Sequence, residues 1–178
     1  MRRIDRTKKS ASALVVLLAV SLMWGCSQSP MDSSLSSDGP RLLVRSPEAA
    51  SHLLQASSLY TDGVISSVNG GRLELPGVVL DVPANAVSSD TLFSILIPDA
   101  GVFFCEFGTS GLVFSTPVRV TMSYSEADLV GVDESTIRIA YLHESSGVWE
   151  DLRCDVDPVN KIVVAYMDHF SAYGIISD

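Results

Sequence analysis

Residues 118–124 read Val118-Arg119-Val120-Thr121-Met122-Ser123-Tyr124. Since successive side chains of a β-strand point to opposite faces, this alternation of apolar and polar residues predicts a strand. One face of that strand lies in a core and the other faces water. Residues 137–141 repeat the pattern, with Ile137, Ile139 and Tyr141 alternating with Arg138 and Ala140.

A pattern of short apolar runs separated by turn residues extends on both sides of this stretch. From Gly63 onward, short runs of Val, Ile, Leu and aromatic residues are separated by Gly, Pro, Asn, Asp and Ser, which is typical of strands and turns. The predicted strands are 64–68, 72–75, 78–82, 92–97, 102–107, 118–124, 136–142, 148–153, 162–166 and 172–176. Gly70-Gly71 predicts a hairpin between the first two, and Pro76-Gly77 separates the second from the third.

This spacing of strands predicts an all-β domain over residues 63–178. Strands at intervals of about 8–12 residues without crossover helices favour an antiparallel β-sandwich. One helical turn is expected over 125–128, from Ser125-Glu126-Ala127-Asp128. The predicted core aromatics are Phe103, Phe107, Phe114, Trp149, Tyr166 and Phe170.

Residues 1–25 are typical of a secretion signal. A basic start with five Arg and Lys residues precedes an uncharged, mostly apolar stretch over 11–24, which is too short to span a bilayer. The following Leu22-Met23-Trp24-Gly25-Cys26 resembles a bacterial lipobox, which implies cleavage before Cys26 and lipidation of its thiol. The alternative is an ordinary cleaved signal peptide with Cys26 as a bystander.

Lipidation at Cys26 predicts a place in the bacterial cell envelope. Two or three acyl chains hold a protein stably on a membrane, so the membrane is the first expected partner. Ser27 and Gln28 follow the cysteine, and neither is the aspartate that retains many such lipoproteins at the inner membrane. The outer membrane is therefore the expected location.

The segment 26–62 is expected to be a Ser-rich tether between the anchor and the domain. Its first part is rich in Ser, Asp, Gly and Pro, and it buries too little apolar surface to fold alone. Ser46-Pro47-Glu48 is suited to start a short helix that runs through Leu59. A continued tether without a helix is the alternative.

The charge balance argues against nucleic acid as a partner. The whole chain has 12 basic and 21 acidic residues. Removal of residues 1–25 takes away five basic and one acidic residue and leaves a net charge of −13. Because nucleic-acid binding needs clustered cations that displace counterions, such an acidic chain is a poor candidate.

Several motifs taken together resemble a ZU5-type domain. The chain has GGRLEL at 70–75, VLDVPANAV at 79–87, FGTSGLVFSTPV at 107–118, GVWE at 147–150 and HFSAY at 169–173. The resemblance covers about residues 63–177 and implies a ZU5-like β-sandwich. It also implies that the domain is a binding or structural module with a protein partner. On this interpretation the domain is not an enzyme and holds no cofactor.

The resemblance carries one catalytic alternative at His169-Phe170-Ser171. In some ZU5-type domains such a triplet cleaves itself between Phe and Ser. The hydroxyl of Ser171 would attack the preceding carbonyl, and His169 would take the proton. Cleavage would release residues 171–178.

Cys105 and Cys154 are the two cysteines that remain after lipidation, and an oxidising compartment favours a disulfide between them. Two separate buried thiols are the alternative.

The remaining polar residues give weaker patterns. His52, His143 and His169 have no zinc-ligand spacing, so no metal site is expected from them. Oxygen ligands for Ca²⁺ are available from Glu150, Asp151, Asp155, Asp157 and Asn160. The residues of a β-turn account for this cluster better than a calcium site does. Residues 108–111 predict a β-turn rather than a nucleophile elbow. A carbohydrate-binding sandwich would need aromatic rings on an exposed face, and only Trp149, Tyr60 and a few other tyrosines are available, so the sequence disfavours this class.

Overall fold

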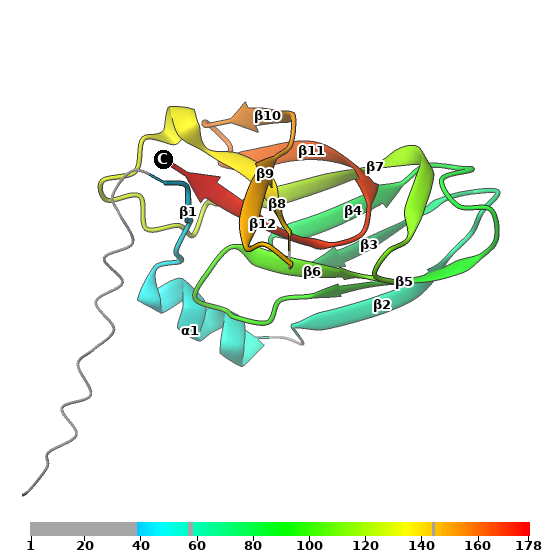
Figure 1. Ribbon diagram of the computed structural model, residues 1–178. Coiled ribbons are helices and arrows are strands. Elements are labelled where there is room, and N and C mark those ends of the chain that lie inside the picture. The colour runs from blue at the N-terminus through cyan, green and yellow to red at the C-terminus, as the bar shows by residue number, and fades with distance from the viewer. Residues whose placement is uncertain (1–38, 57–58, 144) are drawn as a thin grey trace, which may run out of the picture. The chain divides into compact units, whose positions relative to one another are not determined.

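The computed structural model describes residues 39–56, 59–143 and 145–178. Within these residues two antiparallel sheets pack face to face, which confirms the predicted β-sandwich (Figure 1). Cys26 and the expected signal peptide lie outside the described residues. No helix among the described residues is long and apolar enough to cross a membrane.

The larger sheet has seven strands. Its order is β2 (Tyr60–Ile65), β5 (Thr91–Leu96), β6 (Phe104–Gly108), β12 (Ala172–Ser177), β8 (Arg138–His143) and β9 (Val148–Asp151). The short strand β1 (Arg41–Leu42) also pairs with β12, with Arg41 opposite Ser177.

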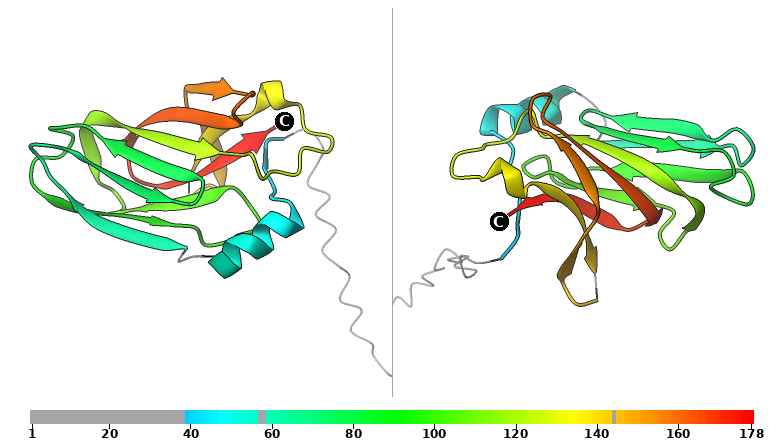
Figure 2. Two further views of the ribbon diagram at one scale, coloured as in Figure 1. Left: turned by 180° about the vertical axis from the view of Figure 1, so that it is seen from behind. Right: turned by 90° about the horizontal axis from the view of Figure 1, so that it is seen from above.

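The smaller sheet has five strands. Its order is β10 (Cys154–Asp157), β11 (Ile162–His169), β7 (Val113–Ser123), β4 (Val78–Val82) and β3 (Gly71–Leu75). The helix α1 (Pro47–Ala56) lies at one end of the sandwich, outside both sheets (Figures 1 and 2). A 3₁₀ turn, η1 (Glu134–Thr136), precedes β8.

The alternation that predicted β7 is confirmed. Val118, Val120 and Met122 are buried between the sheets, while the residues between them are partly exposed. The same rule corrects one core prediction: Tyr166 is 54% exposed, because Ala165 and Met167 on either side of it point inward. Trp149 is half-buried and lies on the outer face of the large sheet, with its ring against Gly174 and Phe104. The four phenylalanines predicted for the core are all buried.

The predicted hairpin at Gly70-Gly71 is wrong. β2 pairs with β5 in the large sheet and β3 pairs with β4 in the small one, so the turn between them carries the chain from one sheet to the other. Only an isolated bridge joins Ser66 to Gly70. Gly70 has a φ of +70°, and a β-carbon there would collide with the carbonyl of Val82. The two glycines therefore serve a sheet-switching turn.

The folded part begins before the expected boundary at residue 63, which lies inside β2. α1 starts as expected, because the Ser46 hydroxyl accepts from the N–H of Ala49 at 3.3 Å, but it ends at Ala56 and not at Leu59. The chain before it is held by Arg45, which is 4% exposed and donates to the carbonyl of Val102 at 2.6 Å. Part of the expected tether thus belongs to the sandwich.

The helical turn expected over 125–128 is also wrong. Ala127 forms a β-bridge with Arg45, and a β-turn precedes it. The short helical segment lies nine residues later, at η1, where the Asp133 side chain accepts from the N–H of Ser135.

Candidate functional site

The triplet His169-Phe170-Ser171 lies where the chain crosses between the two sheets. β11 ends at His169 in the small sheet, and β12 begins at Ala172 in the large sheet (Figure 1). The N–H of Phe170 donates to the carbonyl of Leu112 at 3.0 Å, and the carbonyl of Ser171 accepts from Phe107 at 3.1 Å. Strand β6 and the loop that leads into β7 therefore hold the backbone of this crossing.

The side chain of Phe170 fills the core at this crossing. It is 2% exposed and meets three other phenylalanine rings, from Phe93, Phe107 and Phe114. The centroid distances to Phe93 and Phe114 are 4.7 and 4.9 Å, both edge to face, which is a favoured arrangement of aromatic pairs. The crossing is thus anchored by the apolar residue in its middle.

His169 and Ser171 flank this anchor and both line the larger of two hollows described below, but they make different contacts. The His169 ring lies edge-on to Tyr141, with 5.1 Å between centroids, and its backbone carbonyl accepts from the Tyr173 hydroxyl at 2.7 Å. Within the described residues no hydrogen bond joins His169 to the hydroxyl of Ser171. The acid–base contact that self-cleavage requires is not assembled in this structure.

A polar network that the sequence did not predict lies beside the crossing. The Tyr141 hydroxyl donates to Glu150 Oε2 at 2.7 Å, and His143 Nε2 lies 2.8 Å from the same oxygen and 2.6 Å from the Tyr141 hydroxyl. The three residues meet because β8 and β9 form a hairpin in which Tyr141 faces Glu150. The sequence could have indicated this network only if the position of the β8–β9 turn had been predicted correctly, because the turn sets which residues of the two strands face each other.

Hydrogen bonding changes the acidity of this network. The bond to His143, followed by the bond from Tyr141, lowers the pKa of Glu150. The hydrogen bond that the Tyr141 hydroxyl donates to the same carboxylate raises the pKa of Tyr141, because ionisation of the phenol would remove the donated proton. Glu150 is therefore held as an anion that accepts hydrogen bonds.

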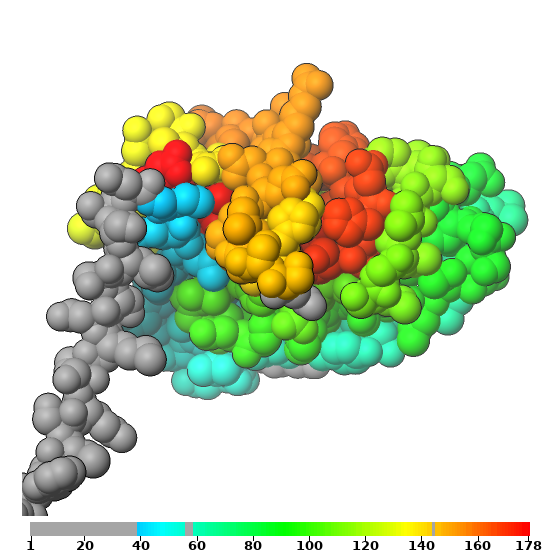
Figure 3. Space-filling view, viewed as in Figure 1, coloured from blue at the N-terminus to red at the C-terminus, as the bar shows by residue number. Residues whose placement is uncertain are grey.

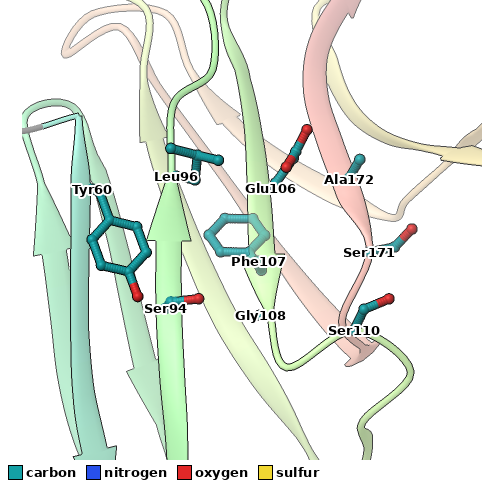
Figure 4. Close-up of a pocket in the computed structure, with 9 residues that line it drawn as sticks. All are labelled: Tyr60, Ser94, Leu96, Glu106, Phe107, Gly108, Ser110, Ser171 and Ala172. Carbon is teal, nitrogen blue, oxygen red and sulfur yellow. The ribbon is translucent and has the colours of Figure 1, made fainter.

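Two hollows adjoin at Ser110 and Ser171, which line both. The smaller, of about 220 Å³, lies on the outer face of the large sheet, with Tyr60 and Ser94 on one side and the two serines on the other (Figure 4). The larger, of about 710 Å³, lies at the rim and is lined by Tyr141, His143 and His169. Figure 3 shows this rim, where the gold β8–β9 hairpin stands beside the orange-red end of β11.

No protein-family model matches the chain, and no curated protein matches it. A function for the chain is therefore argued from its own residues and geometry.

The two cysteines are free thiols in different surroundings. Cys105 is fully buried on β6, and burial raises the pKa of its thiol to about 12. Cys154 begins β10, where its sulfur accepts from the N–H of Ile139 at 3.2 Å. Burial raises the pKa of Cys154 as well.

The acidic residues proposed as calcium ligands are not brought together. Glu150 belongs to the tyrosine–histidine network, and Asp151 pairs with Arg138 at 2.8 Å. Asp157 accepts from the backbone N–H groups of Val159 and Asn160, both at 3.0 Å, as the turn reading expected. Among the described residues no three His, Cys, Asp or Glu side chains are grouped as metal ligands.

Proposed function

We propose that the chain is an exported lipoprotein, anchored through Cys26, whose ZU5-like β-sandwich is a non-catalytic binding module of the cell envelope. The basic start, the apolar stretch over 11–24 and the cysteine at its end support export and lipidation. The absence of an aspartate after Cys26 supports the outer membrane as the location. A protein partner is expected in addition to the membrane.

The ZU5-like assignment is supported by the positions of the motif residues in the sandwich. Gly70-Gly71 lies at the switch between the sheets, and Asn85, with a φ of +62°, occupies the left-handed position of the following turn. The HFSAY segment provides the crossing from β11 to β12. Each motif thus coincides with a change of sheet or of chain direction.

One observation supports the non-catalytic role of the crossing. Phe170 is buried among three phenylalanine rings, its N–H is bonded to the Leu112 carbonyl in the loop before β7, and the Ser171 carbonyl is bonded to Phe107 of β6. Attack by Ser171 on the Phe170 carbonyl would need a base on the serine hydroxyl, and His169 contacts Tyr141 instead. The triplet is therefore interpreted as a structural crossing.

The intact mass of the protein purified from membranes tests both parts of this proposal. We expect a chain that begins at Cys26, carries a diacyl or triacyl group and retains residues 171–178. A Cys26→Ser variant is the matched control and should lose the acyl group and the membrane association. A chain that lacks residues 171–178 would establish self-cleavage and reject the non-catalytic role, and an unacylated wild-type chain would reject the anchor.

A further inference from the structure

The two adjoining hollows at Ser110 and Ser171 have a lining of mixed hydrogen-bonding character. Tyr60, Tyr141 and His143 contribute rings with polar groups, and the serines contribute hydroxyls. No Arg or Lys is among the residues that line them. Together with the carboxylate of Glu106, this lining disfavours an anionic ligand and suits a neutral one that both donates and accepts hydrogen bonds.

Several polar groups here have capacity left for a ligand. Within the described residues the hydroxyls of Ser110 and Ser171 form no hydrogen bond. Glu150 does not line either hollow itself, but it is bonded to Tyr141 and His143, which line the larger one. It uses Oε2 for both of these residues, which leaves Oε1 open to a further donor. A charged acceptor that is held in place by two neighbours forms strong hydrogen bonds with hydroxyl donors.

The smaller hollow lies over strands that are paired on both sides. Its lining includes residues of β5, β6 and β12, and each of these strands has a neighbour on either side in the large sheet. Because the backbone groups of these three strands are used within the sheet, side chains recognise a ligand over them.

Rings stand at both ends of the hollows. Tyr60 is 46% exposed on the outer face, and Tyr141 lies 4.4 Å from the His143 ring on the rim. A pyranose ring combines an apolar face, which stacks on an aromatic ring, with hydroxyls that suit serine and carboxylate partners. The volume of about 710 Å³ at the rim is in the range typical of small-ligand sites, roughly 300–1,000 Å³.

From this combination we infer that the hollows at Ser110 and Ser171 bind a neutral oligosaccharide. Its hydroxyls would bond to Ser171 and to Glu150 Oε1, and its apolar faces would lie on Tyr141 and Tyr60. This inference rests on the proposed binding role, for which it names the class of ligand.

Saturation-transfer NMR on the full chain, purified from membranes and held in nanodiscs, tests the inference. The probes are cellohexaose, maltohexaose, mannohexaose and chitohexaose, with anionic oligogalacturonate and a neutral Gly-Ser-Tyr peptide for comparison and empty nanodiscs as the blank. We expect a signal from at least one neutral sugar and none from oligogalacturonate, because Glu106 and Glu150 repel it. Silence from all the neutral sugars, or a signal from the peptide alone, would overturn the inference.

Two variants locate the binding. Ser171→Ala removes one hydrogen bond and should weaken the sugar about 5–10-fold. Glu150→Gln replaces a charged acceptor and should weaken it about tenfold or more. Asp155→Asn is the matched control, because Asp155 is exposed on β10 and forms no hydrogen bond or ion pair with a described residue.

Equal affinity of the wild type and both variants would place the sugar elsewhere and overturn the inference. A thermal melt of each variant checks that the fold is retained. The mass measurement separates this failure from that of the proposed function. An acylated, uncleaved chain that binds no sugar refutes only the inference, whereas loss of residues 171–178 refutes the non-catalytic role itself.

Discussion

The β11–β12 crossing and the β8–β9 hairpin lie side by side, and each contains a histidine. They differ in polarity and burial. In the crossing an apolar residue, Phe170, is buried among aromatic rings, and the backbone is hydrogen-bonded to β6 and to the loop before β7. In the hairpin, Tyr141, His143 and Glu150 bond to one another on a partly exposed rim. The first region holds the sandwich together, whereas the second presents polar groups to solvent.

The comparison shows that the role of a histidine depends on the side chains that surround it in the fold and cannot be inferred from a sequence motif alone. His169 belongs to the motif that attracted attention in the sequence, yet its ring rests against Tyr141. His143 belongs to no motif, yet it bonds to a carboxylate at 2.8 Å beside a hollow. Four substitutions or modifications test whether the two regions divide as described.

The largest effect is expected for Phe170→Ala. Truncation of a fully buried aromatic ring leaves a cavity and should lower the free energy of unfolding by about 3–5 kcal/mol. Urea denaturation followed by circular dichroism measures the change. Val113→Ala is the control, because Val113 pairs with His169 but is 72% exposed, and it should cost below about 0.5 kcal/mol. Similar costs for the two variants would contradict the anchoring role of Phe170.

A smaller effect is expected for Tyr173→Phe. The variant removes the hydroxyl that donates to the His169 carbonyl at 2.7 Å and keeps the buried ring. Loss of this donor from a partly buried carbonyl should lower the free energy of unfolding by about 1–2 kcal/mol. The exposed tyrosine variant Tyr166→Phe should leave the denaturation midpoint unchanged. If both variants behave alike, the hydroxyl does not support the crossing.

A pH-dependent effect is expected for Glu150→Gln. The pKa of Glu150 is lowered from 4.5, so its ionised form stabilises the folded state above that value. The wild type should be more stable than the variant at pH 7. This advantage should disappear as the pH falls below 4.5 and through the lowered pKa. Thermal melts at a series of pH values measure the difference, and a difference that does not change with pH would contradict the network.

The last prediction concerns the reactivity of the two thiols, which distinguishes the buried core from the partly exposed part of the domain without changing its stability. Cys105 lies under the crossing, opposite Tyr173, whereas Cys154 is half-buried against β8. In a Cys26→Ser chain at pH 8, a thiol reagent should modify Cys154 slowly and leave Cys105 unmodified until denaturant is added. A denatured, unreduced chain should then titrate two thiols. If it titrates none, Cys105 and Cys154 form the disulfide that was considered from the sequence.

The sequence predicted the strands best where one face is buried and the other is wet. β4 was predicted with its correct ends, and β7 was recognised from the alternation along Val118–Ser123. The prediction of these strands succeeds because a strand that is buried on one face has an apolar residue at every second position, whereas a helix has a period of about 3.6. The phenylalanines of the core were predicted for the related reason that large apolar rings are costly to expose.

The sequence could not predict which strands pair. The predicted strand 148–153 corresponds to β9, which ends at Asp151 and joins the large sheet. The next strand, β10, joins the small sheet and was not predicted, because its residues have the composition of a turn. Gly70-Gly71 likewise has hairpin composition and performs a change of sheet. Local composition specifies a turn, but the distant strand that receives the chain is chosen by packing.

The site was the hardest part for the same reason. Tyr141, His143 and Glu150 come together only through the register of one hairpin, and Ser110 and Ser171 come from segments about 60 residues apart. The first grouping depends on the exact position of the hairpin turn, and the second joins segments that are distant in the sequence. The sequence therefore singled out the His169–Ser171 triplet and missed the polar rim beside it.

The pairing of β1 with β12 has a practical consequence for how the domain is handled and presented. Arg41 lies opposite Ser177, so the described chain starts and ends at the same end of the sandwich. A fluorescent protein or affinity tag fused after Asp178 would lie close to the residues that lead into β1. A reporter inserted in the turn at Pro76-Gly77, between β3 and β4, would avoid that end. The fourteen steps from Cys26 to Pro40 can span at most about 50 Å, which limits how far an anchored domain can reach.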